Sequence, residues 1–300
     1  MSDDALAATP RGSSRALRAA ALMVGASALI AVTSLIAKAL GQGVGGPALH
    51  PFQVSAGRFV SGFLAVALVA AWLRPSLAGT PWRAHAVRSL CGWCGVSCLF
   101  AAAAQLPLAT ATALSFLSPI ATMALAIPLL GERVGAVRWL AAAVALTGAM
   151  VLLRPGTDAF DVAALIALAA ALFMGLEAIL IKRLTGYEPP LRILLVNNAF
   201  GAVIAGSVAW FVWTEPSAGQ WPLLALVGVA MVAAQTCFLF AMRGADASFV
   251  IPFFYATLIF AAAYDYAVFA DAPDALGLAG AATIVVGGVM LAVLGGRERA

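Results

Sequence analysis

Long runs of apolar residues, separated by short polar stretches and by Gly and Pro, dominate the pattern along the chain. A helix needs about 20 predominantly apolar residues to cross the hydrocarbon core of a bilayer. The pattern therefore predicts an all-α integral membrane protein with ten spans, since the runs lack the alternation of β-barrel strands. The predicted spans are Ala19–Leu40, Pro51–Leu73, Ser89–Leu106, Ala109–Leu130, Ala136–Leu153, Val162–Ile181, Ile193–Trp213, Trp221–Met242, Ala247–Phe269 and Ala275–Leu294.

The composition agrees with this pattern. Of the 300 residues, 63% are hydrophobic and 10% are charged, whereas soluble domains have about 45–50% apolar and about 25% charged residues. Such a chain cannot cover a water-facing surface, which excludes a soluble enzyme, a nucleic-acid-binding module and a disordered protein. The first apolar run is longer than the apolar core of a signal peptide, so we expect no cleaved leader.

Basic residues predict the orientation, because cytoplasmic loops are enriched in Lys and Arg. A cytoplasmic N-terminus leaves Arg154 in an outer loop and Lys38 and Arg58 within spans. The other 14 of the 17 basic residues then fall in inner segments: Arg11, Arg15, Arg18, Arg74, Arg83, Arg88, Arg133, Arg138, Lys182, Arg183, Arg192, Arg243, Arg297 and Arg299. We therefore expect the protein in the inner or plasma membrane. Both tails, residues 1–18 and 295–300, are expected in the cytoplasm.

An internal repeat relates the two halves of the chain. The tract from Thr110 to Gly148 aligns with the tract from Ser248 to Gly287. The repeat divides the chain into two sets of five spans, residues 19–153 and 160–294. Because five is odd, the second set enters the membrane in the opposite orientation. Inverted repeats are typical of alternating-access transporters, whose substrate site lies near the bilayer midplane between the halves.

Several motifs in the two halves are informative: Leu106-Pro107-Leu108-Ala109-Thr110, Ser118-Pro119 and Leu130-Gly131-Glu132-Arg133 in the first, and Pro252-Phe253-Phe254-Tyr255 and Phe269-Ala270-Asp271-Ala272-Pro273 in the second. With them, residues 19–294 resemble the drug/metabolite transporter superfamily, specifically its EamA-type ten-helix exporters. The resemblance implies a transport cavity bounded by spans 1, 3, 4, 6, 8 and 9, and it does not identify the substrate. Asp271 replaces the family's second-half glutamate, and Asp265 stands where the ninth helix usually has Gly.

Ionisable side chains inside spans are costly and are the first candidates for function. Glu177 lies in span 6, four residues after Phe173. Its carboxylate could bind a substrate ammonium group or release a proton when substrate binds. In the alternative interpretation it reaches the inner headgroups near Lys182 or Arg183. Lys182, like Lys38, ends its span and is expected to snorkel to the interface.

Two further intramembrane charges, Arg58 and Asp265, lie at similar depth in spans 2 and 9. A buried guanidinium needs a partner, and Asp265 is one candidate. A structural pair is favoured over direct substrate contact for Arg58, and the alternative for Asp265 is a carboxylate facing water. Pro119 and Pro252 lie within related spans, where each removes a backbone hydrogen bond and marks a candidate helix break or hinge.

Polar and aromatic residues on shared helix faces complete the predicted site, although such faces also serve simple packing. Phe100 continues the face of span 3 that carries Trp93, and Thr112 belongs to span 4. The candidate substrate-binding residues are Thr33, Trp93, Ser97, Phe116, Phe173, Glu177, Gln235 and Tyr255. The Gly131-Glu132-Arg133 turn is expected to cap a helix end.

The sequence predicts neither a cofactor nor a metal. Cys91, Cys94 and Cys98 have metal-like spacing but lack His or acidic neighbours, so we interpret them as packing residues. His50 and His85 fall on opposite sides of the membrane. The sequence has no P-loop motif, which excludes an ATP-driven pump of that type.

The function predicted from these features is export of small polar metabolites, most of all amino acids, by alternating access. The gradient of the substrate would drive it, with or without protons, and the lipid bilayer and the small-molecule substrate are the expected partners. One alternative is uptake of a cofactor-like metabolite. Another is a membrane receptor or assembly protein without transport, although the chain has no long polar tail of the kind such proteins carry.

Overall fold

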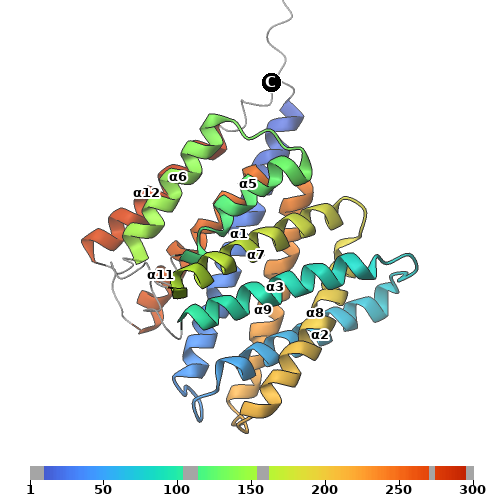
Figure 1. Cartoon of the computed structure of the whole chain (residues 1–300). Coiled ribbons are helices and arrows are strands. Elements are labelled where there is room, and N and C mark those ends of the chain that lie inside the picture. Colours follow the sequence, from blue (N-terminus) through green and yellow to red (C-terminus); the bar gives the residue numbers. More distant parts are fainter. Residues whose placement is uncertain (1–9, 104–113, 154–161, 270–273, 295–300) are drawn as a thin grey trace, which may run out of the picture.

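The computed structural model describes residues 10–103, 114–153, 162–269 and 274–294, and the regular structure within them is helical (Figure 1). The helices and two 3-10 turns are α1 (Pro10–Gly41), α2 (Pro51–Leu73), α3 (Trp82–Ala103), α5 (Ser118–Leu130), α6 (Ala136–Leu153), α7 (Val162–Thr185), α8 (Pro190–Ala209), η1 (Trp210–Val212), α9 (Gln220–Gly244), α10 (Ala247–Val250), η2 (Ile251–Tyr255), α11 (Ala256–Phe269) and α12 (Ala275–Leu294). Predictions for Thr112, Arg154, Asp271 and both tail ends, and for the side chains of Ser97 and Phe100, lie outside the described residues.

Seven helices of the described ranges are long and apolar enough to cross a membrane: Ser14–Gly41, Pro51–Leu73, Ala164–Thr185, Pro190–Val212, Gln220–Gly244, Ala247–Val268 and Ala275–Leu294. Ser118–Leu130 and Ala136–Val151 are shorter apolar helices. These helices confirm the predicted class, an all-α membrane protein. The total of ten spans stays a prediction.

Helix α3 begins earlier than predicted, at Trp82 and not at Ser89. Pro81 starts it, because its fixed φ and its missing N–H suit a helix start, and its carbonyl accepts the His85 N–H at 3.2 Å. Arg88 is therefore not a residue of an inner loop. It lies in the second turn of α3 with only 4% of its surface exposed.

The predicted ninth span is a broken helix. One turn of α-helix, α10, is followed by η2, which contains Pro252, and then by α11. Proline lacks the N–H that would continue the α-helical hydrogen bonds, and the chain tightens into a 3-10 turn there. In the related helix of the first half, Pro119 lies near the start of α5, after a turn at Phe116 and Leu117.

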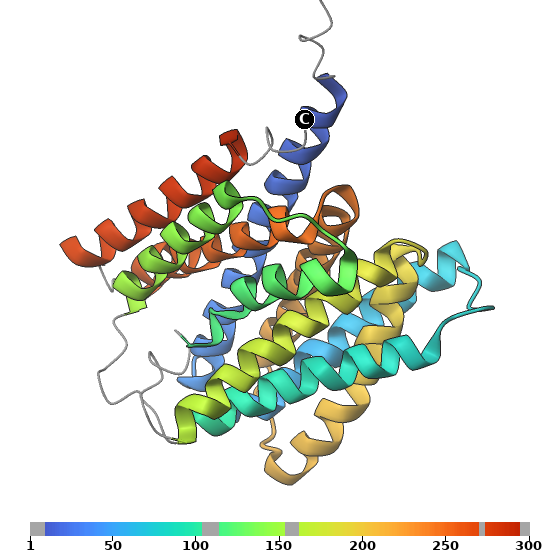
Figure 2. The same cartoon turned by 45° about the horizontal axis from the view of Figure 1, so that its top comes forward.

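Pairwise packing of helices organises the molecule. Helix α1 packs on α9 and α11, α7 packs on α3 and α5, α2 packs on α8 and α9, and α6 packs on α12. Figures 1 and 2 show the α6–α12 pair on one flank and the α2–α8 pair on the opposite flank, with α1 and α7 crossing between them. The helices of the two sequence halves are thus interleaved and do not form separate bundles.

Glycines let α6 and α12 approach closely. A methyl group at Gly148 would lie 2.6 Å from the carbonyl oxygen of Gly280, and one at Gly287 would lie 2.8 Å from that of Ala141. The internal repeat pairs Gly148 with Gly287, and the same shift along the sequence pairs Ala141 with Gly280. Each contact is therefore repeated with the two halves exchanged.

The α2–α8 pair shows the same exchange at the same shift. A methyl group at Gly62 would lie 2.9 Å from Oδ1 of Asn198, and one at Gly201 would overlap the ring of Phe59. The repeat pairs Phe59 with Asn198 and Gly62 with Gly201. Positions equivalent in sequence therefore occupy exchanged places in two separate helix pairs.

The turn between α5 and α6 fastens the broken helix of the second half. The Glu132 carboxylate accepts the backbone N–H groups of Ala247 and Ser248 at 2.8 and 3.0 Å and the Ser248 hydroxyl at 2.6 Å. Arg138 donates to the same hydroxyl at 2.8 Å and pairs with Asp246 at 3.3 Å. The Gly131-Glu132-Arg133 turn thus caps a helix of the opposite half.

Candidate functional site

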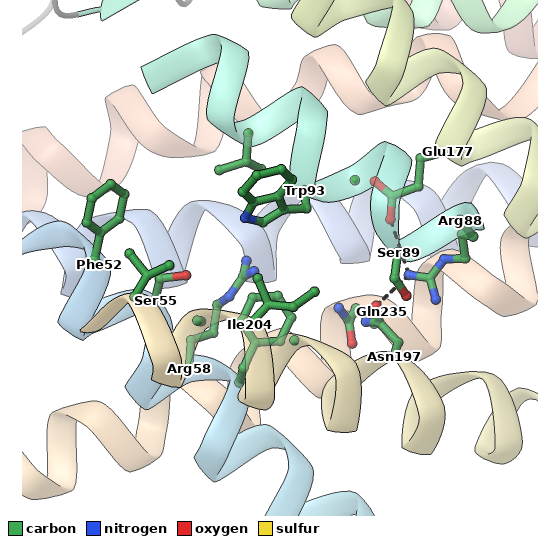
Figure 3. A pocket seen from close by; sticks show the side chains of 16 residues that line it. Phe52, Ser55, Arg58, Arg88, Ser89, Trp93, Glu177, Asn197, Ile204 and Gln235 are labelled. Atoms are coloured by element: carbon green, nitrogen blue, oxygen red, sulfur yellow. Dashed lines mark hydrogen bonds and ion pairs between the residues drawn. The ribbon is translucent and has the colours of Figure 1, made fainter. Parts of the chain in front are cut away.

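A cavity of about 270 Å³ lies among α2, α3, α7, α8 and α9 (Figure 3) and is called the main cavity because it contains the ionised side chains. A larger and mostly apolar pocket of about 630 Å³ lies among α2, α8, η1 and α9. The polar and aromatic lining of the main cavity includes Arg58, Arg88, Trp93, Glu177, Asn197 and Gln235. The cavity extends from Phe52, near the start of α2, to Arg88 on α3. It combines ionised groups with aromatic and amide side chains, which suits a small polar molecule with an organic body.

An ion-pair network closes one end of this cavity. An Arg88 guanidinium nitrogen donates to Oε1 of Glu177 at 3.2 Å and to Oδ1 of Asn197 at 2.7 Å. Nearby, Asn198 donates to Gln235 at 3.1 Å. Arg88 comes from α3, Glu177 from α7 and Asn197 from α8, so the network ties three helices together. A buried charge is stable only with such a partner, because its desolvation is costly.

Gly92 makes room for the Glu177 carboxylate. A methyl group at Gly92 would lie 2.8 Å from the carboxyl carbon of Glu177. One turn further along α3, a methyl group at Gly95 would lie 2.8 Å from Cγ of Met174. Because these two glycines have no side chain, the side chains of α7 pack directly against the backbone of α3.

The cations that were alternative partners for Glu177 are occupied elsewhere. Arg183 donates to the carbonyl of Leu129 at 2.6 Å, and Lys182 donates to the carbonyls of Met242 and Ala245. Lys182 thereby caps the end of α9, a contact that the prediction of an interfacial snorkel did not include. The Glu177 carboxylate turns toward α3 and not toward these inner cations.

Asp265, one candidate partner for Arg58, pairs with another cation. Asp265 accepts two hydrogen bonds from Lys38, at 2.7 and 2.8 Å, because α1 packs along α11. Lys38 thus has an acidic partner on α11 that the prediction of an interfacial snorkel did not include. The Arg58 guanidinium instead lies over the ring of Phe59, 4.2 Å from the ring centroid, and faces the main cavity.

A second cavity of about 190 Å³ adjoins the first, among α3, α5, α7, α8, α9 and η2. Arg88, Glu177, Asn197 and Gln235 line both. These four side chains therefore form the boundary between the two cavities, at a point where a shift of any one of them alters the connection.

The predicted site residues fall into two groups. Trp93, Glu177 and Gln235 line the main cavity, and Pro119 lines the second. Thr33, Phe116, Phe173 and Tyr255 lie outside the described lining of both, and their contact with substrate stays a prediction. The Thr33 hydroxyl donates to the Ile30 carbonyl of its own helix at 2.7 Å.

Phe116 and Tyr255 meet each other. Tyr255 is completely buried, its hydroxyl donates to the Phe116 carbonyl at 2.8 Å, and the ring centroids are 6.0 Å apart. The repeat pairs these two positions as well, so equivalent positions of the two halves touch here. The contact joins the two broken helices and is a packing contact.

Sequence reasoning missed Arg88 and Asn197. Arg88 stands between a charged segment and an apolar run, and its charge alone favours a loop position. The helix-starting Pro81 was the signal that it belongs to α3. Asn197 and Asn198 interrupt an otherwise apolar run, and two adjacent amides inside a span were a sign of an internal polar site.

Helices of membrane-crossing length around a charged internal cavity define a polytopic membrane protein that binds small molecules. Residues 17–154 and 161–293 match the EamA-like transporter family, and the chain belongs to this family. The match confirms the predicted membership of the drug/metabolite transporter superfamily. The chain is a multi-pass protein of the inner or plasma membrane and a small-molecule transporter.

Three relatives illustrate the range of this family. The chain is 36% identical to a riboflavin transporter of Rhizobium johnstonii over 179 residues, 58% of this chain and 57% of that protein. It is 28% identical to an S-adenosylmethionine uptake transporter of Rickettsia prowazekii over 80% of this chain and 82% of that one. It is 29% identical to a pseudopaline exporter of Pseudomonas aeruginosa over 68% and 73%.

A solved crystal structure shares the fold. It aligns with a TM-score of 0.78 over 94% of this chain and 98% of its own, at 20% sequence identity. At this identity the likeness concerns the arrangement of the helices and carries no information about the substrate.

Proposed function

We propose that the chain is a secondary transporter that carries small polar metabolites by alternating access, with the substrate in the main cavity. In this proposal ten spans form two inverted halves, residues 19–153 and 160–294, with both termini in the cytoplasm. The glycine contacts that are exchanged between equivalent positions support it. Contacts repeated with the partners exchanged are what two halves related by a two-fold axis produce.

A difference between the halves is the observation that carries the proposal. Helices α2 and α9 are in tight contact, since a methyl group at Gly228 would overlap the Ser61 hydroxyl and lie 2.5 Å from the Gly62 nitrogen. The repeat pairs Gly228 with Ser89 on α3, and Gly62 with Gly201 on α8. Ser89 and Gly201 line the main cavity. One contact is thus closed while its equivalent is open.

This asymmetry fits a two-state cycle. If the halves exchange conformations, α3 closes on α8 while α2 separates from α9, and the cavity opens on the other side. The Arg88–Glu177–Asn197 network lies at the boundary that such a motion has to break. The gradient of the substrate drives the cycle, with or without a coupled proton on Glu177.

For the substrate we propose amino acids and similar small polar metabolites, moved outward. Ionised groups of both signs in one cavity support this class. The second candidate is uptake of a cofactor-like metabolite. The relatives that carry riboflavin and S-adenosylmethionine favour it, together with Trp93 and Phe52, whose aromatic rings line the same cavity.

Counterflow in proteoliposomes tests the function. The purified full-length chain is reconstituted into vesicles that are loaded with unlabelled substrate, and uptake of the labelled compound is measured. The compounds are amino acids, riboflavin and S-adenosylmethionine, and exchange of one amino acid is expected. Glu177→Gln keeps the size of the side chain but removes the charge that pairs with Arg88 at 3.2 Å. The unpaired Arg88 disturbs the lining of the cavity, and we expect an affinity roughly 10- to 150-fold lower, the range for the loss of a charged hydrogen bond. Exposed Glu215 provides the matched control, because Glu215→Gln removes the same charge outside the cavity.

The outcomes separate the alternatives. Exchange of a cofactor without any amino acid would favour the second candidate. No exchange of any probe, by protein that is folded and inserted, contradicts transport. An unchanged affinity and pH profile in Glu177→Gln removes this residue from the site.

A further inference from the structure

The main cavity has one positive charge in excess. Among the described residues that line it, the ionised side chains are Arg58, Arg88 and Glu177. Arg88 and Glu177 neutralise each other at 3.2 Å. Arg58 forms no ion pair in the described part of the chain, and the Glu177 carboxylate, already paired with Arg88, attracts it only across the cavity. A charge without a direct partner inside a membrane protein is a mark of function.

The described surroundings of Arg58 leave one of its buried hydrogen-bond donors without an acceptor. Its buried Nε has no acceptor among the described atoms. The Phe59 ring, 4.2 Å from the guanidinium carbon, attracts the cation through its face but offers no oxygen acceptor. A guanidinium has five N–H donors in a planar fork that matches the two oxygens of a carboxylate. The missing partner is therefore an anion.

Neighbouring side chains add to an anion site. Ser55 precedes Arg58 by one turn of α2, and Figure 3 shows both beside Trp93, which projects from α3. The serine hydroxyl can donate to a second oxygen. The indole of Trp93, 47% exposed, provides a flat apolar surface for the organic part of a ligand.

We propose that the cavity binds the carboxylate of its substrate at Arg58, so that small organic monocarboxylates, amino acids included, are its substrate class. This rests on the proposed transport function. Recognition then differs from the sequence expectation, in which Glu177 binds an ammonium group, because Arg88 already occupies that carboxylate. One excess positive charge matches a monoanion, whereas a phosphate dianion would leave the cavity with a negative charge.

Three indole compounds test this class because they differ only in their charged groups. Tryptophan has both a carboxylate and an ammonium, indole-3-propionate has the carboxylate alone, and tryptamine has the ammonium alone. Equilibrium dialysis of the purified full-length protein with each labelled compound gives the affinities. We expect both carboxylates to bind roughly 10- to 100-fold more tightly than tryptamine, as expected for hydrogen bonds to a charged group.

Variants assign the preference to Arg58. Arg58→Gln is expected to abolish the preference for a carboxylate, and Arg58→Lys to retain part of it, since the charge stays while the fork is lost. Arg243 is exposed at the end of α9, and Arg243→Gln, which changes the net charge equally, should bind all three compounds as the wild type does. The comparison among compounds on the wild type does not depend on the folding of any variant.

Equal or tighter binding of tryptamine overturns the inference, as does a carboxylate preference that survives in Arg58→Gln. Failure of all three compounds to bind also counts against it. The transport proposal is tested separately by counterflow. Exchange of riboflavin without any carboxylate preference contradicts this inference alone. A carboxylate preference in dialysis without exchange of any probe contradicts transport alone.

Discussion

At the level of single residues, the site depends on which charges meet, and that depends on tertiary packing. The sequence identified Glu177 and Arg58 because an ionised side chain in an apolar run is costly wherever it lies. It did not identify their surroundings. Their similar depth along the spans suggested Asp265 as a partner for Arg58. Because α11 packs on α1, Asp265 pairs with Lys38. Depth in the membrane does not say which helices are neighbours.

Gly92 is a residue whose role only the structure reveals, and it gives a prediction. Gly92→Ala places a methyl group 2.8 Å from the carboxyl carbon of Glu177. The carboxylate has to move away from Arg88, so we expect a loss of about 1–3 kcal/mol in the free energy of unfolding, the usual cost of overpacking, together with weaker substrate binding. Thermal unfolding in detergent and counterflow affinity measure the two effects.

Gly206 on α8 offers the matched control, since nothing lies within 4 Å of a methyl group there. Gly206→Ala is expected to leave transport unchanged, with stability equal to the wild type or higher by up to about 1 kcal/mol. If Gly92→Ala behaves like this control, the close packing of Glu177 against α3 is not needed for function.

At the level of the helices, the sequence predicted most elements well and their starts less well. The apolar runs gave α2, α6 and α12 the same bounds that the structure shows, because proline or charged and turn residues mark both ends. The predicted α3 was too short, since the charges near its start outweighed the helix-starting Pro81. The break in the ninth span was signalled by Pro252, but the 3-10 turn around it depends on packing against α1, α5 and α6.

The cap that Glu132 provides for α10 leads to a prediction about this helix. Glu132→Ala removes the acceptor of two backbone N–H groups and of the Ser248 hydroxyl. We expect a loss of about 1–2 kcal/mol, as for other helix caps, and a lower temperature of thermal unfolding. Exposed Glu215 again serves for comparison, and Glu215→Ala should stay within about 0.5 kcal/mol of the wild type. Equal stability of the two variants contradicts the cap.

At the level of the whole molecule, the internal repeat predicted contacts between helices, which the positions of the spans alone did not. It relates the Gly148 and Gly287 contacts and brings Phe116 against Tyr255. The sequence could not show which of two equivalent contacts is closed, because both conformations are compatible with the same repeat. The closed α2–α9 contact and the open α3–α8 cavity are therefore information from the structure alone.

The closed contact is suited to a cross-link. Ser61 on α2 and Leu224 on α9 touch, with 2.9 Å between the hydroxyl and the carbonyl oxygen. Leu224 lies one turn before Gly228, and a cysteine there leaves the close approach of Gly228 to Gly62 intact. The first pair is therefore Ser61→Cys with Leu224→Cys. Ser89, the equivalent of Gly228, already has a side chain and needs no such substitute.

The open contact provides the second pair. The repeat pairs Gly228 with Ser89 on α3, and Ser61 with Phe200 on α8. Ser89→Cys with Phe200→Cys therefore marks the contact that is expected to close when the halves exchange conformations. Both pairs are introduced into a variant from which the four native cysteines have been removed, namely Cys91, Cys94, Cys98 and Cys237.

The exchange of closed and open contacts during transport is tested by oxidising these chains in proteoliposomes. Each pair should form its disulfide, each disulfide should stop counterflow, and a reductant should restore it. A chain that carries both pairs should form one disulfide or the other in each molecule, because the two contacts close in different states. The exchange is contradicted if the Ser89→Cys, Phe200→Cys disulfide never forms during counterflow, or if it forms completely and counterflow continues at the rate of the reduced protein.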